Sequence, residues 1–141
     1  MKKAIILFLS MTMLLVLSAC GKEPVNELKY KEFKKEVTSK DFEGFAYILT
    51  DYEAEDNDYM VQIKKAFEEE KSSLVYYNAQ TSDKKTYNKF NRDSADVKMY
   101  LPINEIVYLK DDRKSVFEID EKILTHEGYE ALKKFIADHK K

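Results

Sequence analysis

The sequence predicts an α/β fold in which a central mixed sheet of about four strands is flanked by helices. Three observations lead to this prediction. Helical stripes alternate with short apolar runs along the chain, the first two runs bracket a helix, and the last two runs flank a compact polar turn. A strand-helix-strand unit permits parallel pairing, whereas a tight turn joins antiparallel strands, so both directions are expected in one sheet.

Four segments have the apolar spacing of amphipathic helices, with one face directed at the core and charged residues between. The stripes are Tyr30-Phe33-Val37, Met60-Ile63-Phe67 within about 57–71, Tyr87-Phe90 within 83–92, and Tyr129-Leu132-Ile136. We expect Thr81 or Ser82 to cap the third helix and Thr125 to cap the fourth.

Four apolar runs are expected to form strands, at residues 45–50, 74–77, 106–109 and 116–119. The run at 45–50 is continuous rather than alternating, which suits a strand covered on both faces. Leu28 is a candidate for a further short strand ahead of the first helix.

The N-terminus has the form of a lipoprotein signal. Lys2 and Lys3 precede an apolar run that ends in Leu17-Ser18-Ala19-Cys20, and Cys20 is the single cysteine of the chain. This arrangement resembles the bacterial lipobox, in which the thiol receives a diacylglyceryl group and becomes the new N-terminus. A transmembrane anchor fits less well, because a spanning helix needs about 20 apolar residues. We therefore expect a signal peptide at 1–19, a lipidated tether at 20–26, a domain at 27–141 and anchoring on the extracytoplasmic face of the cell membrane.

Charge and size bound the function classes. Removal of residues 1–19 leaves 22 basic and 26 acidic residues in a single-domain chain, a formal charge of −4. Nucleic-acid binding is not expected, because it requires a concentrated basic face. No phosphate-binding glycine loop, Ser-His-Asp set or zinc-binding pair is visible, so neither cofactor nor bound metal is expected.

The order of the elements and a proline just before the third long strand resemble the thioredoxin fold. Tyr47-Ile48-Leu49-Thr50-Asp51 is similar to the strand that delivers the active-site loop of that family, and Leu101-Pro102-Ile103 is similar to the segment that holds its cis-proline. The bacteriocin-transport-accessory type of bacterial thioredoxin-like protein is the nearest resemblance. It covers roughly residues 27 to 138 and rests on order and spacing.

The chain departs from that family where the Cys-x-x-Cys motif would stand. The loop here reads Asp51-Tyr52-Glu53-Ala54-Glu55-Asp56, and Tyr52 and Glu55 have the spacing of the two thiols, within a residue of register. Acidic side chains at this position also suit simple stabilisation of a helix N-terminus. A cation-binding reading is open but poor, because Asp56 and Gln62 stand where an EF-hand needs Gly and Glu.

In redox members of the family, the cis-proline peptide faces the thiols and helps to hold an extended substrate. The resemblance thus implies a surviving groove formed by Tyr52, Glu55, Leu101 and Pro102. A proline at the start of a strand has an ordinary structural reading too, which needs no cis bond. His126 and His139 are widely separated and are expected to be solvated or capping residues.

These observations favour a membrane-tethered, redox-inactive thioredoxin-like lipoprotein that binds a protein or peptide in the cell envelope, and not an enzyme. Two alternatives stay open. One is a small-molecule- or cation-binding lipoprotein, and the other is a degenerate relative of thiol-disulfide oxidoreductases.

Overall fold

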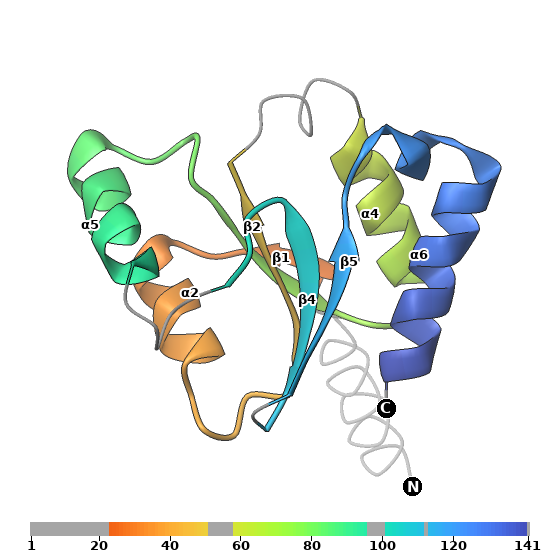
Figure 1. Ribbon diagram of the computed structural model, residues 1–141, viewed down its shortest axis with the longest axis horizontal. Coiled ribbons are helices and arrows are strands. Elements are labelled where there is room, and N and C mark those ends of the chain that lie inside the picture. The colour runs from red at the N-terminus through yellow and green to blue at the C-terminus, as the bar shows by residue number, and fades with distance from the viewer. Residues whose placement is uncertain (1–22, 51–57, 96–100, 112, 141) are drawn as a thin grey trace, which may run out of the picture.

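The computed structural model describes residues 23–50, 58–95, 101–111 and 113–140, which form a mixed sheet between two layers of helices (Figure 1). The predicted α/β class with a helix-flanked sheet is therefore confirmed. In chain order the elements are β1 (Val25–Glu27), α2 (Tyr30–Val37), β2 (Gly44–Leu49), α4 (Tyr59–Glu69), β3 (Leu74–Asn78), α5 (Lys84–Ser94), β4 (Glu105–Lys110), β5 (Arg113–Glu118), the 3₁₀ helix η3 (Glu121–Leu124) and α6 (His126–His139).

The strands follow the order β1-β3-β2-β4-β5 across the sheet. β3 pairs in parallel with both β1 and β2, while β4 pairs antiparallel with β2 and with β5. Tyr47 of β2 lies opposite Tyr76 of β3 and opposite Ile106 of β4. The parallel half and the hairpin half expected from the sequence thus meet along β2.

The sheet has five strands rather than about four, because β1 joins it ahead of the first helix. Val25 and Asn26, assigned to the tether, pair with Leu74 and Val75 of β3, and the Leu74 N–H donates to the Pro24 carbonyl at 2.8 Å. Leu28 lies just beyond this strand. A three-residue strand with a single buried side chain is too short to show a periodic pattern, which is why the sequence placed it one residue or more too late.

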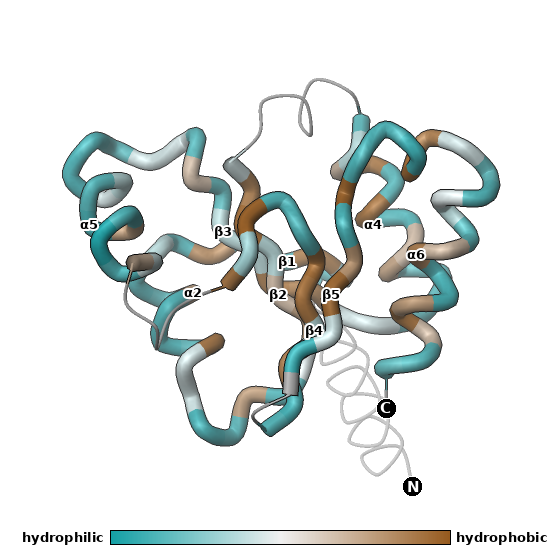
Figure 2. Tube along the Cα trace, viewed as in Figure 1, coloured by the Kyte–Doolittle hydropathy of each residue, from teal (hydrophilic) through white to brown (hydrophobic). Residues whose placement is uncertain are grey.

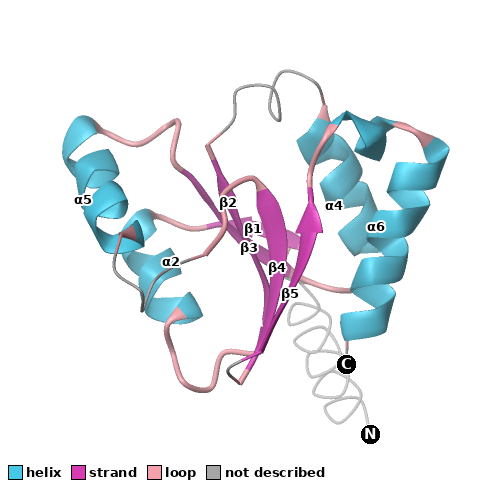
Figure 3. Cartoon of the chain, viewed as in Figure 1, coloured by secondary structure: helices cyan, strands magenta, loops and turns pink. Residues whose placement is uncertain are grey.

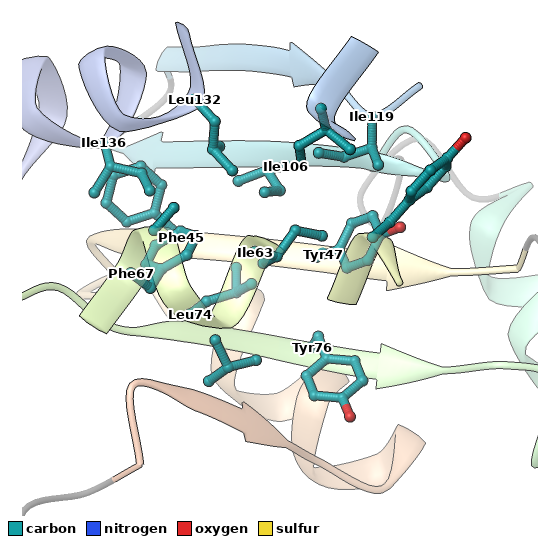
Figure 4. Packing of buried hydrophobic residues seen from close by; sticks show 14 of the residues in the cluster. Phe45, Tyr47, Ile63, Phe67, Leu74, Tyr76, Ile106, Ile119, Leu132 and Ile136 are labelled. Carbon is teal, nitrogen blue, oxygen red and sulfur yellow. The ribbon is translucent and has the colours of Figure 1, made fainter. Parts of the chain in front are cut away.

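The core has two halves, one on each face of the sheet. Alternate residues of β2 point to opposite faces, so Phe45, Tyr47 and Leu49 pack under α4 and α6, whereas Ala46 and Ile48 pack under α2 and α5. Figure 4 shows the first half, with Ile63 and Phe67 of α4 and Leu132 and Ile136 of α6 pointing toward the strands. This two-sided burial explains the unbroken apolar run at 45–49, and Figure 2 shows hydrophobic residues along β2 and β4.

Of the two predicted helix caps, that of α6 is confirmed and that of α5 is wrong. Thr125 caps α6 by accepting from the Gly128 N–H at 3.1 Å, as predicted. The cap of α5 is Asp83 rather than Thr81 or Ser82, and its carboxylate accepts from the N–H groups of Lys85 and Thr86. No helix in the described ranges is both long and apolar enough to cross a bilayer.

The sheet defines two poles that matter for the site. At the carboxyl-end pole β1, β2 and β3 end, at Glu27, Leu49 and Asn78, and β4 begins. At the amino-end pole the same three strands begin, and the last residues of α6 lie close by, since Lys140 donates to the Glu70 carbonyl that precedes β3. Figure 3 shows the strands of the sheet running between these poles, with the helices on either side.

Candidate functional site

The carboxyl-end pole carries the described part of the predicted groove. Thr50 stands where the chain leaves β2 for the acidic loop, and segment 101–104 approaches the start of β4 beside it. Cys20, Tyr52 and Glu55 lie outside the described residues, so the placement of the last two opposite the proline segment stays a prediction.

Leu101 belongs to the core rather than to a groove. Its side chain is 7% exposed and is part of the cluster under α2 and α5, with Ile48 and Val107 among its members. Pro102 is half-buried, and Ile103 is 51% exposed. Burial of a leucine stabilises by roughly 1.5–3 kcal/mol, which favours this inward orientation over a solvent-facing one. The accessible part of the segment is therefore Pro102 and Ile103.

The cis peptide implied by the thioredoxin resemblance is absent, because both residues of the Leu101–Pro102 bond are described and no described peptide bond is cis. A trans X–Pro bond is the favoured form in general. The chain is instead turned into β4 by Asn104, whose φ of 57° lies in the left-handed region. Asparagine tolerates this region better than most residues.

Asn104 also ties three segments together at this pole. Its N–H donates to the Ile48 carbonyl at 2.8 Å, and its carbonyl accepts from the Ile119 N–H at 3.3 Å. The side-chain Oδ1 accepts from the Thr50 N–H at 2.9 Å and lies 3.2 Å from the Thr50 hydroxyl. The end of β2, the start of β4 and the exit of β5 are thus fixed relative to one another by one residue. In the sequence Asn104 stands two residues before the apolar run at 106–109, a position that gives no signal of these contacts.

Exposed apolar side chains come from three segments that reach the same pole. Val61 lies in the first turn of α4, Ile103 follows the proline, and Leu124 ends η3. Exposed apolar residues beside a fixed backbone edge are a common feature of protein-binding surfaces. This arrangement suits recognition of a polypeptide.

A second, polar hollow of about 530 Å³ lies between the ends of β1 and β3. Nearly all of its lining residues carry a hydroxyl, amide or charged group. The lining residues are Glu27, Leu28, Lys29, Tyr30, Tyr77, Asn78, Thr81, Ser82, Asp83 and Thr86.

Hydrogen bonding rather than acid-base chemistry is what this hollow offers. Burial raises the pKa of Tyr77 above its usual value, although the hydrogen bond with Ser82 at 2.6 Å opposes the shift. The bonds from the Thr86 hydroxyl and N–H hold the pKa of Asp83 below its usual range. Tyr77 is therefore a neutral phenol at neutral pH, and the Asp83 carboxylate is committed to capping α5.

The structure brings no metal-binding set together in the described residues. His126 and His139 stand at opposite ends of α6, about 20 Å apart at the helical rise. The His139 ring packs between Tyr108 and Phe135, and its Nδ1 lies 2.8 Å from the Phe135 carbonyl. His139 is therefore a half-buried packing residue, which differs from the solvated or capping role expected from the sequence.

No family model matches the chain, and comparison with curated proteins and with solved structures gave no significant match.

Proposed function

We propose that the protein is a membrane-tethered, redox-inactive thioredoxin-like lipoprotein that binds a protein or peptide partner in the cell envelope. The observation that carries the proposal is the arrangement around β2. β2 and β3 are parallel and joined through α4, and an antiparallel hairpin follows a proline segment that is hydrogen-bonded to the end of β2. This arrangement supports the thioredoxin-like assignment.

Redox inactivity follows from the cysteine content. Cys20 is the single thiol in the sequence, and acylation of that thiol leaves none to attack a disulfide. A reductase would need a free thiolate at the start of α4, and the chain supplies acidic residues in the preceding loop instead. The purified lipidated protein should therefore reduce insulin no faster than a protein-free control, and measurable turnover would contradict this part of the proposal.

Tethering gives the domain a defined orientation. Val25, five residues after Cys20, is buried in β1, so the lipid and the sheet are separated by at most about 18 Å of extended chain. β1 begins at the amino-end pole. A lipidated Cys20 would hold that pole near the bilayer and direct the carboxyl-end pole, with Ile103 and Leu124, away from it. A partner in the envelope could then reach the exposed apolar surface.

Site-specific photo-cross-linking in native membranes tests the proposal. A photoreactive residue at position 103 should capture one envelope protein, whereas the same residue at position 116 should not. Val116 is the matched control because it is 46% exposed, close to the 51% of Ile103, but lies midway along the edge strand β5. Equal capture at both positions, or none at position 103, would argue against a partner surface at this pole.

A small-molecule-binding role is the second candidate, and the polar hollow between β1 and β3 favours it. Ser82→Ala removes one hydroxyl from the lining together with its 2.6 Å hydrogen bond with Tyr77, and Thr86→Val removes another together with its 2.7 Å hydrogen bond to Asp83, so circular dichroism should first verify that each variant is folded. If this role is correct, ligand-induced thermal shifts in a metabolite screen should disappear in the Ser82→Ala protein. Shifts unchanged by that variant would place the ligand elsewhere.

A further inference from the structure

Helix α5 contributes little to the core. Of its residues 84–94, the single buried one is Phe90, which packs with Tyr30 and Tyr77. Figure 2 shows α5 as a largely hydrophilic helix beside the more apolar sheet. Packing alone therefore does not explain the composition of this helix, because most of its side chains point into solvent.

That solvent face is basic in a protein that is acidic as a whole. Residues 84–92 include four cations and no acidic residue, whereas the chain from Cys20 onward has a formal charge of −4. The cations are Lys84, Lys85, Lys89 and Arg92, and all four side chains are exposed. A charge average over the whole chain hides this local excess.

The acidic residues that flank the cations are engaged with other donors. Asp83 accepts from two N–H groups and a hydroxyl at the start of the helix. Asp93 accepts from the Tyr30 hydroxyl at 2.6 Å and pairs with Lys34 at 2.8 Å. Of the four cations, Lys89 adds a charge interaction with Asp93, and none forms an ion pair of 4.0 Å or less with a residue in the described ranges.

Helix α6 shows the contrasting pattern. Its Lys133 pairs with Glu69 and Glu130, and its Lys134 pairs with Asp138. Lys84 and Lys85 of α5 lie in the first helical turn, where the helix dipole disfavours cations. The basic face of α5 thus has no ion-pair partner in the described ranges, and two of its lysines lie where the helix dipole disfavours them.

We propose that this face of α5 binds a linear polyanion that carries repeated phosphate groups. A shallow hollow of about 800 Å³ lies among Lys84, Lys85, Asn88, Asn91 and Arg92, with no acidic side chain in its lining. Arginine and lysine recognise phosphate oxygens by charge-assisted hydrogen bonds, and asparagine amides add neutral donors. The lining thus has the donors that a phosphate chain requires.

The length and polarity of this basic face favour a linear polyanion over other anionic ligands. Lys84 and Arg92 are about 12 Å apart along the helix, so a single phosphate cannot contact both ends. An anionic bilayer surface is a poorer fit, because interfacial helices insert an apolar face and the one buried apolar anchor of α5 points into the core. A nucleic acid is also a poorer fit, because no aromatic ring lines the hollow for base stacking.

Polyphosphate binding by the full-length protein in uncharged detergent micelles tests the proposal. Labelled inorganic polyphosphate should bind, and the affinity should fall with rising salt as counterions are released. The variant K84Q/K85Q/R92Q should weaken binding by at least about 10-fold, since each cation near an anionic surface contributes roughly a factor of five. The control K35Q/K40Q/K64Q alters the net charge equally at exposed lysines outside α5, and should change the affinity by less than about threefold.

Each remaining arm either supports or overturns the proposal. Inorganic phosphate should fail to compete with polyphosphate, even at concentrations about 100-fold above those at which polyphosphate saturates the protein. Equal losses in the two triple variants would show that net charge, not this face, is responsible. Absence of polyphosphate binding, or tighter binding to phosphatidylglycerol vesicles or to an oligonucleotide of equal charge, would overturn the assignment. Circular dichroism of each variant verifies that it is folded.

Discussion

Replacement of Asn104 by alanine should destabilise the domain strongly for a residue that is only partly buried. Alanine removes the Oδ1 that accepts from the Thr50 N–H at 2.9 Å and from the Thr50 hydroxyl at 3.2 Å. It also places a residue with a Cβ and no compensating side-chain hydrogen bond at a φ of 57°. Two separate contributions are therefore lost in one substitution.

The magnitudes can be assigned separately. A partly buried donor left without its acceptor costs about 1–3 kcal/mol. The left-handed conformation costs an ordinary L-residue about 1–2 kcal/mol. The sum, about 2–5 kcal/mol, is a large share of the 5–15 kcal/mol that is typical of domain stability. At about 4 °C per kcal/mol, Tm should fall by roughly 8–20 °C.

A short variant series separates the two contributions. Asn104→Gly loses the side-chain acceptor but accepts the backbone angle, so it should be more stable than Asn104→Ala by about 1 kcal/mol. Asn104→Asp keeps an acceptor oxygen and should stay within about 1 kcal/mol of the native protein. Urea unfolding followed by circular dichroism gives the free energies of unfolding.

The order of stability decides whether the reasoning holds. We expect the native protein and the Asp variant to be the most stable, the Gly variant intermediate and the Ala variant the least stable. A Gly variant less stable than the Ala variant would refute the backbone argument. An Ala variant with native stability would refute the contribution of the Asn104 side chain, which joins the segment before β4 to Thr50 at the end of β2.

Three further changes have defined outcomes. Gly128→Ala should destabilise by about 1–3 kcal/mol in urea unfolding, because the new Cβ would lie 1.9 Å from the Lys122 backbone carbonyl, and an unchanged midpoint would contradict this. Hydrogen bonds from Lys34 and then Tyr30 hold the pKa of Asp93 below its usual value. The contribution of Asp93 to the free energy of unfolding is therefore fully present above the unfolded pKa of about 3.9, and it is lost as the pH falls through the lowered folded pKa. The stability gap between the native protein and Asp93→Asn should therefore shrink in acid, and a gap constant from pH 7 to pH 2 would disprove the linkage. Cys20→Ala should be released or left unprocessed in membrane fractionation, whereas a processed, membrane-bound mutant would exclude lipidation at this residue.

Long periodic segments were predictable, because burial imposes a repeat that the sequence displays. The stripe Tyr30-Phe33-Val37 became α2, and the continuous run at 45–50 became the doubly covered strand β2. Short segments were not predictable in this way. β1 has three residues and one buried side chain, so its existence depends on β3 lying alongside it.

The site was harder to predict than the fold, because single residues determine it. Leu101 was assigned to the groove on its position before the proline, but its side chain faces the core while Ile103 is exposed. Residues i and i+2 of an extended chain would share a face, so the difference arises from the bend at 103–104, which the sequence pattern does not predict. Asp83 was passed over as a cap because the apolar stripe of α5 begins only at Tyr87, which leaves the first helical residue undefined in the sequence. Asn104 joins segments 54 residues apart, a contact that no local pattern contains.

The two helical layers are held in different ways, and this difference lets stability and binding be tested separately. α4 and α6 share a packed core and are bridged by ion pairs such as Lys133–Glu69, so charge changes there alter the free energy of unfolding as well. α5 is held mainly by Phe90 and by the Asp93 contacts with α2. Since Lys84, Lys85 and Arg92 take no part in those contacts, their neutralisation should leave unfolding nearly unchanged, within about 0.5 kcal/mol for exposed side chains. Any loss of polyanion binding in that variant would then report on the basic face itself.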